Sequence, residues 1–272
     1  MNRRHWVVPA SIGLVLSVLA SPAFAACSNL PGWTALRSAL LNSVGNADNG
    51  GLGFNMWGTL VANDGTVCAV AFSGFGFNAQ WLGSRVISAQ KANTANDFSV
   101  GKGTPAASEF PHGLALSTAN LYSAVQPGGS LYGLQHSNPV DTATAYDNAQ
   151  TSPTFDLDIG TVNDPMVGHR IGGVNVFGGG LAAYRAGVKV GGIGVSGDTS
   201  CTDHMVAWRV RNRLGLDGLG TVGGMSGDAT RPDNIIFDIT PNPDGGTGIS
   251  LHGFGHPTCF NNPDPTKLPV VH

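Results

Sequence analysis

Charged residues are scarce in this sequence, and glutamate is almost missing from it. They make up 11% of the 272 residues, the formal net charge is −3, and Glu109 is the only glutamate. So few cations give no electrostatic basis for binding nucleic acid or an anionic membrane surface. The other carboxylates are aspartates clustered in polar loops, where they are expected to form turns. We therefore expect no nucleic-acid partner.

Cysteine is also scarce, and its spacing excludes several familiar sites. Cys27, Cys68, Cys201 and Cys259 form no C-x-x-C and no C-x-x-C-H. Zinc ribbons, thioredoxin-like centres and covalent c-type haem attachment are therefore excluded. An even number of cysteines in an exported chain favours two disulfides, for which three connectivities exist. We predict Cys27–Cys68 and Cys201–Cys259, because both pairs would fix chain ends that otherwise fray.

Two other functional motifs are incomplete. A nucleophile elbow requires G-x-S-x-G, whereas in Gly194–Gly197 and Gly224–Gly227 the second glycine follows the serine directly. Asp156–Gly160 begins like a calcium loop but lacks the third ligand and the bidentate glutamate of an EF-hand. We predict neither a serine hydrolase nor an EF-hand calcium site, and we assign no catalytic residue.

The histidines lie in polar or Gly/Pro-rich surroundings. His252 and His256 are four residues apart and close to Cys259, but HGFGHP is not a helical sequence, so the spacing does not place them on one helix face. A loop histidine that donates to a backbone carbonyl is the expected role of each. Metal binding by this group remains the alternative, and we assign no metal site from the sequence.

The only long apolar run lies at the N-terminus. Two arginines precede Val7–Ala20, and an A-x-A sequence ending at Ala25 follows, which predicts a secretory signal peptide over residues 1–25. The run is shorter than the ~20 residues of a membrane span. An alternative is a lipoprotein acylated at Cys27. Without the two arginines, 12 cationic residues face 17 acidic ones and the formal charge is −5. We expect a periplasmic or secreted protein.

Glycine, by contrast, is abundant at 40 residues, which together with the low charge suits a compact α/β protein with tight loops. Apolar residues at helical spacing predict helices over Trp33–Val44 and from about Ala79 to Phe98. Between them, Phe54–Ala62 and Val67–Phe72 are predicted as two strands of a hairpin, because Asn-Asp-Gly-Thr joins them.

The second half of the chain is predicted to contain fewer regular elements. They are a short helix within Leu114–Gln126, strands over Arg170–Phe177 and Ala186–Ser196 with Ala182–Arg185 extending one of them, a helix over Met205–Leu214, and a strand-like run over Asn234–Ile239. The region Asp141–Val167 is rich in Asp, Thr and Pro, and we expect a surface-loop insertion there. Residues 217–272 are expected to form a Gly/Pro-rich C-terminal extension.

The chain is organised around Val188–His204, where a strand leads into a polar helix start. Gly194 and Gly197 remove side-chain bulk from this segment. Asp198 and Thr199 can accept hydrogen bonds from the first turn of the helix. A strand that opens onto a bare helix N-terminus can hold an anion or a polar ligand. The alternative is an ordinary strand–turn–helix joint with its caps satisfied.

The stretch Gly172–Leu214 resembles the closing half of the GlcG/HbpS haem-binding family. That half has a GGVP-type strand, a second strand ending in G-x-x-G-V-S-G, and a helix with an early aspartate, which Asp203 matches. The family's first half has a D-x-x-G hairpin and a K-A-x-T-A helix. Thr59–Phe72 is similar to the hairpin, and Ala89–Phe98, with Lys91, is similar to the helix.

The matches span roughly Trp33–Leu216 apart from the insertion. The family's charged segment after the second strand is replaced here by Ser73–Phe77, SGFGF. The resemblance implies an α/β fold with a single antiparallel sheet of about five strands and packed helices over residues 26–216, followed by an irregular tail. It further implies an exported small-ligand protein that binds haem non-covalently and forms a homo-oligomer.

Haem requires an apolar slot, an axial ligand and cations for its propionates. Aromatic residues that could form the slot are Phe75, Phe77, Trp81 and Phe177. The expected ligand-binding residues are a wall of Lys91, Gly194, Ser196, Asp203 and His204, an axial His136 or His169, and Arg170 as propionate partner. The family is functionally broad, so two alternatives stay open. One is an enzyme acting on haem or on a small 2-hydroxy or oxo acid, and the other is a structural or assembly domain without a ligand.

Overall fold

The computed structural model describes residues 26–76, 78–104, 109–146, 154–246 and 248–272. The predicted signal peptide, residues 1–25, and Phe77 lie outside the described residues. No helix in the described ranges is long and apolar enough to cross a membrane.

The centre of the fold is a four-stranded antiparallel sheet, in the order β2-β1-β5-β4. Its strands are β1 (Trp57–Ala62), β2 (Val67–Phe72), β4 (Gly180–Arg185) and β5 (Val188–Ser196). The α/β class and the antiparallel sheet confirm the prediction, although the sheet has four strands and not about five. The hairpin of β1 and β2 forms where Asn-Asp-Gly-Thr predicted it.

The strand predicted over Arg170–Phe177 is wrong. Only isolated bridges form there, between Thr66 and Arg170 and between Val140 and Gly172. The physical reason lies in Gly172 and Gly173, whose φ angles of 63° and 87° take the backbone out of the extended region. The strand that pairs with β5 is instead β4, which begins at Gly180.

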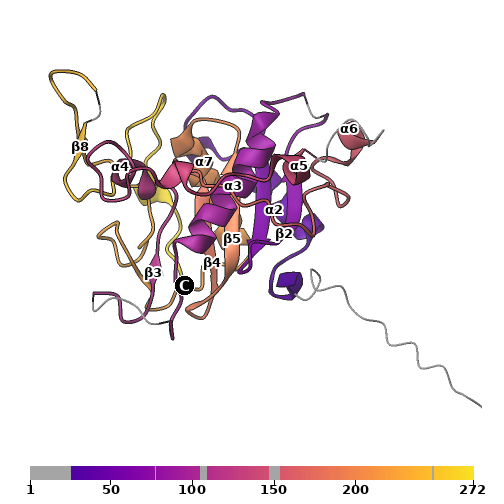
Figure 1. Ribbon diagram of the computed structural model, residues 1–272, viewed down its shortest axis with the longest axis horizontal. Coiled ribbons are helices and arrows are strands. Elements are labelled where there is room, and N and C mark those ends of the chain that lie inside the picture. Colours follow the sequence, from indigo (N-terminus) through magenta and orange to yellow (C-terminus); the bar gives the residue numbers. More distant parts are fainter. Residues whose placement is uncertain (1–25, 77, 105–108, 147–153, 247) are drawn as a thin grey trace, which may run out of the picture.

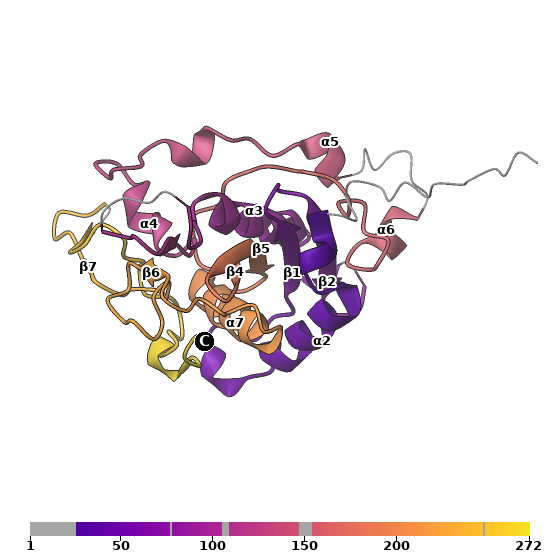
Figure 2. The same cartoon turned by 90° about the horizontal axis from the view of Figure 1, so that it is seen from below.

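Helices cover both faces of the sheet (Figure 2). The helix α3 (Gly83–Asp97) lies on one face, and α2 (Trp33–Val44) and α7 (Ser200–Arg213) lie on the other. The main core forms between the sheet and this second pair, with Leu36, Leu40, Leu60, Met205 and Trp208 all buried. On the α3 face, a smaller apolar cluster joins Trp57, Val70 and Phe72 to Val86 and Ala89. The predicted helix over Trp33–Val44 is confirmed at both ends.

The glycines of β5 allow α3 to approach the sheet backbone to backbone. A Cβ placed on Gly194 would lie 1.8 Å from the Ser88 carbonyl oxygen, and one on Gly192 would lie 2.2 Å from that of Ala92. No side chain larger than hydrogen fits at these contacts. The helix therefore fills the space beside Gly194 that the sequence suggested would be open.

The helix α7 begins earlier than the predicted Met205, because Thr199 caps it by accepting from the Thr202 amide. Of the polar residues at the expected helix start, Thr202 and Asp203 therefore lie in the first turn of α7, and Asp198 and Thr199 precede it. In contrast, α3 begins four residues after the predicted Ala79, at Gly83.

Two disulfides fasten the chain, and both confirm the predicted connectivity. Cys27 is bonded to Cys68, and Cys201 is bonded to Cys259. The first joins the short 3-10 helix η1 (Cys27–Asn29) to β2, and the second joins α7 to the C-terminal segment. Since Cys27 is held in a disulfide, its thiol is not free for the acylation considered above.

The region 141–167 is more than the surface loop that we predicted. It contains the single-turn helices α5 (Thr142–Ala145) and α6 (Phe155–Asp158). Asp164 and Met166 are buried, and the Asp164 carboxylate accepts from the buried Arg85 guanidinium of α3, with Nε to Oδ2 at 2.8 Å. A buried guanidinium requires such a partner, so this region completes the α3 face of the core.

The C-terminal region also contributes to the core. The Arg211 guanidinium of α7 donates two hydrogen bonds to Asp233, at 2.5 and 2.9 Å, and Leu268 belongs to the main apolar cluster. The remaining short elements are η2 (Ala47–Asn49), β3 (Leu114–Ala115), α4 (Leu121–Ala124), η3 (Leu134–His136), β6 (Gly223–Gly224), β7 (Ile239–Thr240), β8 (Ile249–Ser250) and η4 (Pro265–Lys267). Figure 1 shows α4 and β8 gathered on the side of the molecule away from α5 and α6.

Candidate functional site

Three of the expected ligand-binding residues meet where α3 crosses the end of β5. The Lys91 ammonium lies 2.7 Å from Asp203 Oδ2, 3.2 Å from the Val195 carbonyl oxygen and 3.5 Å from Ser196 Oγ. The Phe177 ring lies 4.2 Å from the same nitrogen. The second Asp203 oxygen accepts from the Asp198 amide. The group is therefore mutually satisfied before any ligand is considered.

The Lys91–Asp203 pair is sealed from solvent, with side-chain exposures of 0% and 1%. Burial raises the pKa of Asp203 to about 6, against the opposing effect of Lys91, and burial lowers the pKa of Lys91. The pair joins α3 to α7 across the sheet end. Its observed contacts are those of an internal ion pair that no ligand reaches.

His204 is buried next to this pair but points toward the C-terminal region. Its Nε2 lies 3.2 Å from Asn234 Oδ1 and also accepts from the Ile235 amide. Burial lowers the pKa of His204 to about 4, so the ring is neutral near pH 7. Its Nδ1 is buried without a hydrogen-bond partner among the described residues.

The other three expected residues lie on the surface. His136 and His169 are exposed, and the Arg170 guanidinium pairs with Asp64 in the β1–β2 turn. That turn is at the opposite end of β1 from Trp57, which pairs with Ser196. The structure does not bring Arg170 and His169 to the Lys91 group, so the residues expected to form one site lie in separate places.

A different part of the molecule offers a cleft suited to a small molecule. It has a volume of about 380 Å³ and lies between α2, the sheet edge at β2 and the loop around α6. Such a volume falls in the range of small-ligand pockets. The side chains that line it are those of Trp33, Arg37, Trp57, Phe72, Phe75, Asp156, Leu157, Ile159 and Thr161. We call it the aromatic cleft.

The floor of the aromatic cleft is closely packed. Trp57 and Phe72 are cross-strand partners in β1 and β2, and their rings stack at 4.3 Å with an interplanar angle of 18°. Gly160 packs against this pair, where a Cβ would lie 2.9 Å from the Trp57 ring. The Trp33 indole donates to the Gly160 carbonyl at 2.9 Å. This bond fixes the loop around α6 to α2, and it holds the two walls together.

The rim of the cleft combines apolar groups with a cation. Phe75 and Leu157 are exposed at 89% and 76%. The Arg37 guanidinium lies 5.7 Å from the Trp33 ring centroid. Arg37 makes no ion pair with any residue that the structure describes. Its charge is therefore free to meet an anionic group at the mouth of the cleft.

The fit of haem differs between these two places. The sealed Lys91 group has no space for a macrocycle, since α3 occupies the face of Gly194. The aromatic cleft offers apolar walls and one cation, but none of its lining residues within the described ranges is His, Cys, Met or Tyr. Haem could be held there by its flat faces and a propionate, with no protein ligand to its iron.

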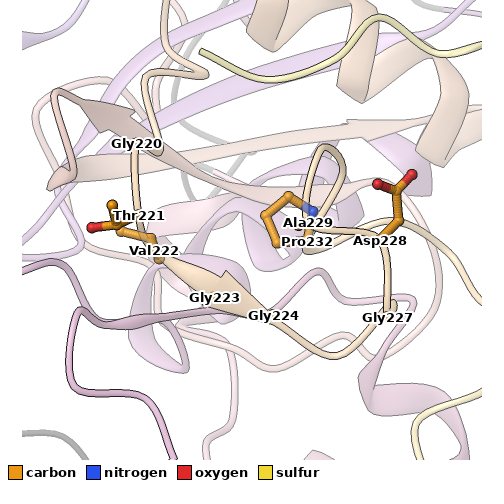
Figure 3. Close-up of a pocket in the computed structure, with 9 residues that line it drawn as sticks. All are labelled: Gly220, Thr221, Val222, Gly223, Gly224, Gly227, Asp228, Ala229 and Pro232. Carbon is orange, nitrogen blue, oxygen red and sulfur yellow. The ribbon is translucent and has the colours of Figure 1, made fainter.

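A second cavity, of about 360 Å³, lies beside β6 and is drawn in Figure 3. Its wall is mostly backbone, because four of its lining residues are glycines between Gly220 and Gly227. The one charged side chain is that of Asp228, whose oxygens already accept from Thr230 and Arg231. This cavity therefore presents fewer free recognition groups than the aromatic cleft.

Sequence reasoning identified Phe75 as a pocket residue but missed the rest of the cleft. Of the other aromatic residues considered for a slot, Trp81 packs edge-on against Phe54 at the surface, and Phe177 lies under Lys91. Trp33 and Arg37 lie on the predicted helix Trp33–Val44, but the sequence pattern indicated no binding role for them. Nothing in the sequence indicated that residues 156–161 would close against them.

Comparisons with known proteins give structural likeness only. No protein-family model and no curated protein matches the chain. Among solved structures, it is similar to Klebsiella pneumoniae protein ORFY, described by the family model DUF336, with 21% identity, a TM-score of 0.41, and coverage of 68% of this chain and 90% of that one. It is also similar to PduOC, solved as a haem complex, with 21% identity, a TM-score of 0.41, and coverage of 66% of this chain and 90% of that one. For HbpS the identity is 17%, the TM-score is 0.37, and the coverage is 76% of this chain and 99% of that one.

Proposed function

We propose that this protein binds a flat, largely apolar small molecule that carries an anionic group, and that it does so in the aromatic cleft. The observation that carries the proposal is the combination of an aromatic floor and walls with the unpaired Arg37 at the rim. Aromatic rings favour planar partners through stacked or edge contacts. A guanidinium favours a carboxylate or phosphate.

Haem and related tetrapyrroles are the ligand class that we propose first. The support comes from the resemblance of Gly172–Leu214 to the GlcG/HbpS family, of which we propose the chain to be a divergent member. A macrocycle placed in the cleft would contact Phe75, Trp33 and the exposed edge of Phe72, with a propionate at Arg37. Since none of the described residues that line the cleft is an axial ligand, metal-free protoporphyrin should bind about as well as haemin.

The experiment is a titration of the purified protein with haemin and with protoporphyrin IX. Binding is measured by the quenching of tryptophan fluorescence and by the change in the Soret band. We expect quenching by both compounds and only a small Soret change for haemin, without the spectrum of an axially ligated iron. Phe75→Ala and Arg37→Gln should each weaken binding by roughly tenfold, a loss of about 1.4 kcal/mol.

Matched controls are available on other faces of the molecule. Phe260 is exposed at 72%, and Arg213 is an exposed cation at the end of α7. Phe260→Ala and Arg213→Gln should leave both titrations unchanged. Equal weakening by the control and cleft variants would reject the cleft as the site. Absence of any quenching would reject tetrapyrroles as the ligand class.

We also propose that the protein acts in the periplasm or outside the cell. Two disulfides are typical of chains that fold in an oxidising compartment, and the predicted signal peptide agrees with this. Homo-oligomer formation stays a prediction. The exposed Phe54–Trp81 pair is an apolar surface that such an assembly could cover.

A further inference from the structure

The disulfide between α7 and the C-terminal segment lies against a buried histidine. Cys201 and Cys259 are bonded to each other, and His256, which is 1% exposed, lies beside them with its Nδ1 3.9 Å from Cys201 Sγ. One donor atom from each of the three residues lies within 4.8 Å of the others. Among the described residues, the Cys27–Cys68 disulfide belongs to no such group.

The tautomer of His256 leaves one nitrogen able to act as a ligand. Its Nδ1 is 2.7 Å from the Pro257 carbonyl oxygen, which can only accept, so Nδ1 carries the proton. The lone pair is therefore on Nε2, which faces Ser200 Oγ at 3.1 Å. A backbone acceptor on Nδ1 is the arrangement that orients histidine ligands in metal sites.

The sulfur atoms are also placed for a thiolate form. The Cys201 amide, in the first turn of α7, donates to Cys259 Sγ at 3.2 Å, and Ser200 Oγ lies 3.6 Å from the same sulfur. Such donors at a helix N-terminus stabilise a thiolate. The Cys201 and Cys259 Cα atoms are 6.0 Å apart, so rotation of the side chains can separate the sulfurs without movement of the backbone.

From this arrangement we propose that reduction of the Cys201–Cys259 disulfide creates a site for one soft divalent cation such as Zn²⁺, held by the two sulfurs and His256 Nε2. Ser200 Oγ or water would complete four-coordination. In a tetrahedral zinc site, bonds of about 2.3 Å to sulfur and 2.0 Å to nitrogen separate the ligand atoms by roughly 3.5–3.8 Å. In the oxidised protein the donor atoms of the group lie within 4.8 Å of one another, and Ser200 Oγ lies between His256 Nε2, at 3.1 Å, and Cys259 Sγ, at 3.6 Å. After reduction, side-chain rotation has to bring Nε2 and the two sulfurs to the spacing that the cation requires.

The chemistry balances with an external dithiol as reductant. The dithiol breaks the Cys201–Cys259 bond, becomes a disulfide itself, and passes two hydrogens to the protein sulfurs. Cation binding then releases the two thiol protons, because the thiolates are the ligands. Cys259 is only partly buried, so its sulfur is the point of attack for the dithiol.

The test uses the full chain before and after reduction with a phosphine, which is removed before Co²⁺ is added as a spectroscopic substitute for Zn²⁺. We expect one Co²⁺ per reduced chain, with tetrahedral d–d bands and a thiolate charge-transfer band, and no such bands for the oxidised protein. His256→Ala should weaken Co²⁺ binding by at least tenfold. His252→Ala is the matched control, because His252 is an exposed histidine of the same segment.

A second variant tests the Cys201–Cys259 pair in the absence of the other disulfide. In Cys27→Ser/Cys68→Ser only the Cys201–Cys259 pair remains, and the same cobalt spectrum is expected after reduction. Circular dichroism shows whether the reduced chain keeps its fold. The proposal is overturned if the reduced, folded protein gives no thiolate–cobalt band, if His256→Ala binds as tightly as the wild type, or if reduction unfolds the chain and Co²⁺ fails to restore it.

Discussion

Lys91 Nζ lies 2.7 Å from Asp203 Oδ2, and neither side chain is exposed by more than 1%. A buried pair of this kind is costly to break, because the partner left behind is a buried charge without compensation. The pair joins the helices on the two faces of the sheet, so its main consequence concerns stability.

Lys91→Ala and Asp203→Ala should therefore each lower the free energy of unfolding by about 3–5 kcal/mol. Replacement of both by Lys91→Met/Asp203→Leu should cost clearly less than the sum of the two single changes. Urea denaturation measures all three. Arg170→Ala is the control, since its pair with Asp64 is exposed and should contribute less than about 1 kcal/mol. If either single substitution lowers the free energy of unfolding as little as Arg170→Ala does, the stabilising role of the Lys91–Asp203 ion pair is contradicted.

The contribution of His204 to stability should fall on acidification. Burial lowers the pKa of His204 to about 4 from 6.5, so between these values the unfolded chain binds a proton that the folded chain does not. The stability that the neutral His204 contributes is therefore full above pH 6.5 and is lost as the pH falls toward 4, while Asp203, whose pKa is raised to about 6, acts in the opposite direction. The slope of the unfolding free energy against pH reports how many protons are bound on unfolding. His204→Gln should reduce this number by close to one in the window between pH 4 and 6.5. The exposed His136→Gln should leave the slope unchanged.

Gly194→Ala should be strongly destabilising, by at least about 3 kcal/mol, because its Cβ would meet the Ser88 carbonyl at 1.8 Å and force α3 away from β5. Gly32→Ala is the matched control, because no atom lies within 4 Å of the added Cβ. Thermal unfolding of the two variants provides the comparison. A similar melting temperature for both would mean that α3 does not pack against β5 as described.

The loop around α6 should become looser when the indole bond of Trp33 is removed. Trp33→Phe keeps an aromatic ring but loses the donor to the Gly160 carbonyl, which should cost about 1 kcal/mol. Hydrogen exchange of residues 159–161 should accelerate, while exchange in β1 stays unchanged. Unaltered exchange at 159–161 would show that this bond does not hold the loop.

Removal of the Cys27–Cys68 disulfide by Cys27→Ser/Cys68→Ser should cost about 4 kcal/mol, because the bond closes a loop between residues 41 positions apart. The expected result is a lower urea midpoint with little change in the native circular dichroism spectrum. A midpoint within error of the wild type would indicate that the unfolded chain is already compact in this region.

The sequence predicted those parts of the fold that depend on local pattern. The Asn-Asp-Gly-Thr hairpin, the helix Trp33–Val44 and both disulfides are as expected. The prediction of a strand over Arg170–Phe177 was wrong. The apolar residues suggested an extended segment, whereas the consecutive Gly172 and Gly173 adopt positive φ there.

The candidate site was harder to predict, because it depends on contacts between residues far apart in the chain. The sequence correctly indicates that Gly194 leaves space beside the strand, but a local pattern does not show whether a ligand or a helix fills that space. Trp33 and Gly160 are 127 residues apart, and their hydrogen bond closes the aromatic cleft. Polar composition alone suggested that the region around Asp164 would lie on the surface, since its partner Arg85 could not be identified from sequence.

The main core takes residues from near both ends of the described chain, with Leu36 and Leu268 in one cluster. Arg211 likewise depends on Asp233, which follows it by 22 residues. A nascent chain that has emerged only as far as α7 would therefore hold an uncompensated guanidinium and an unfinished interior. Stable folding must therefore wait until Asp233 and Leu268 have been synthesised, and a chain truncated before Asp233 is expected to be recovered as aggregate.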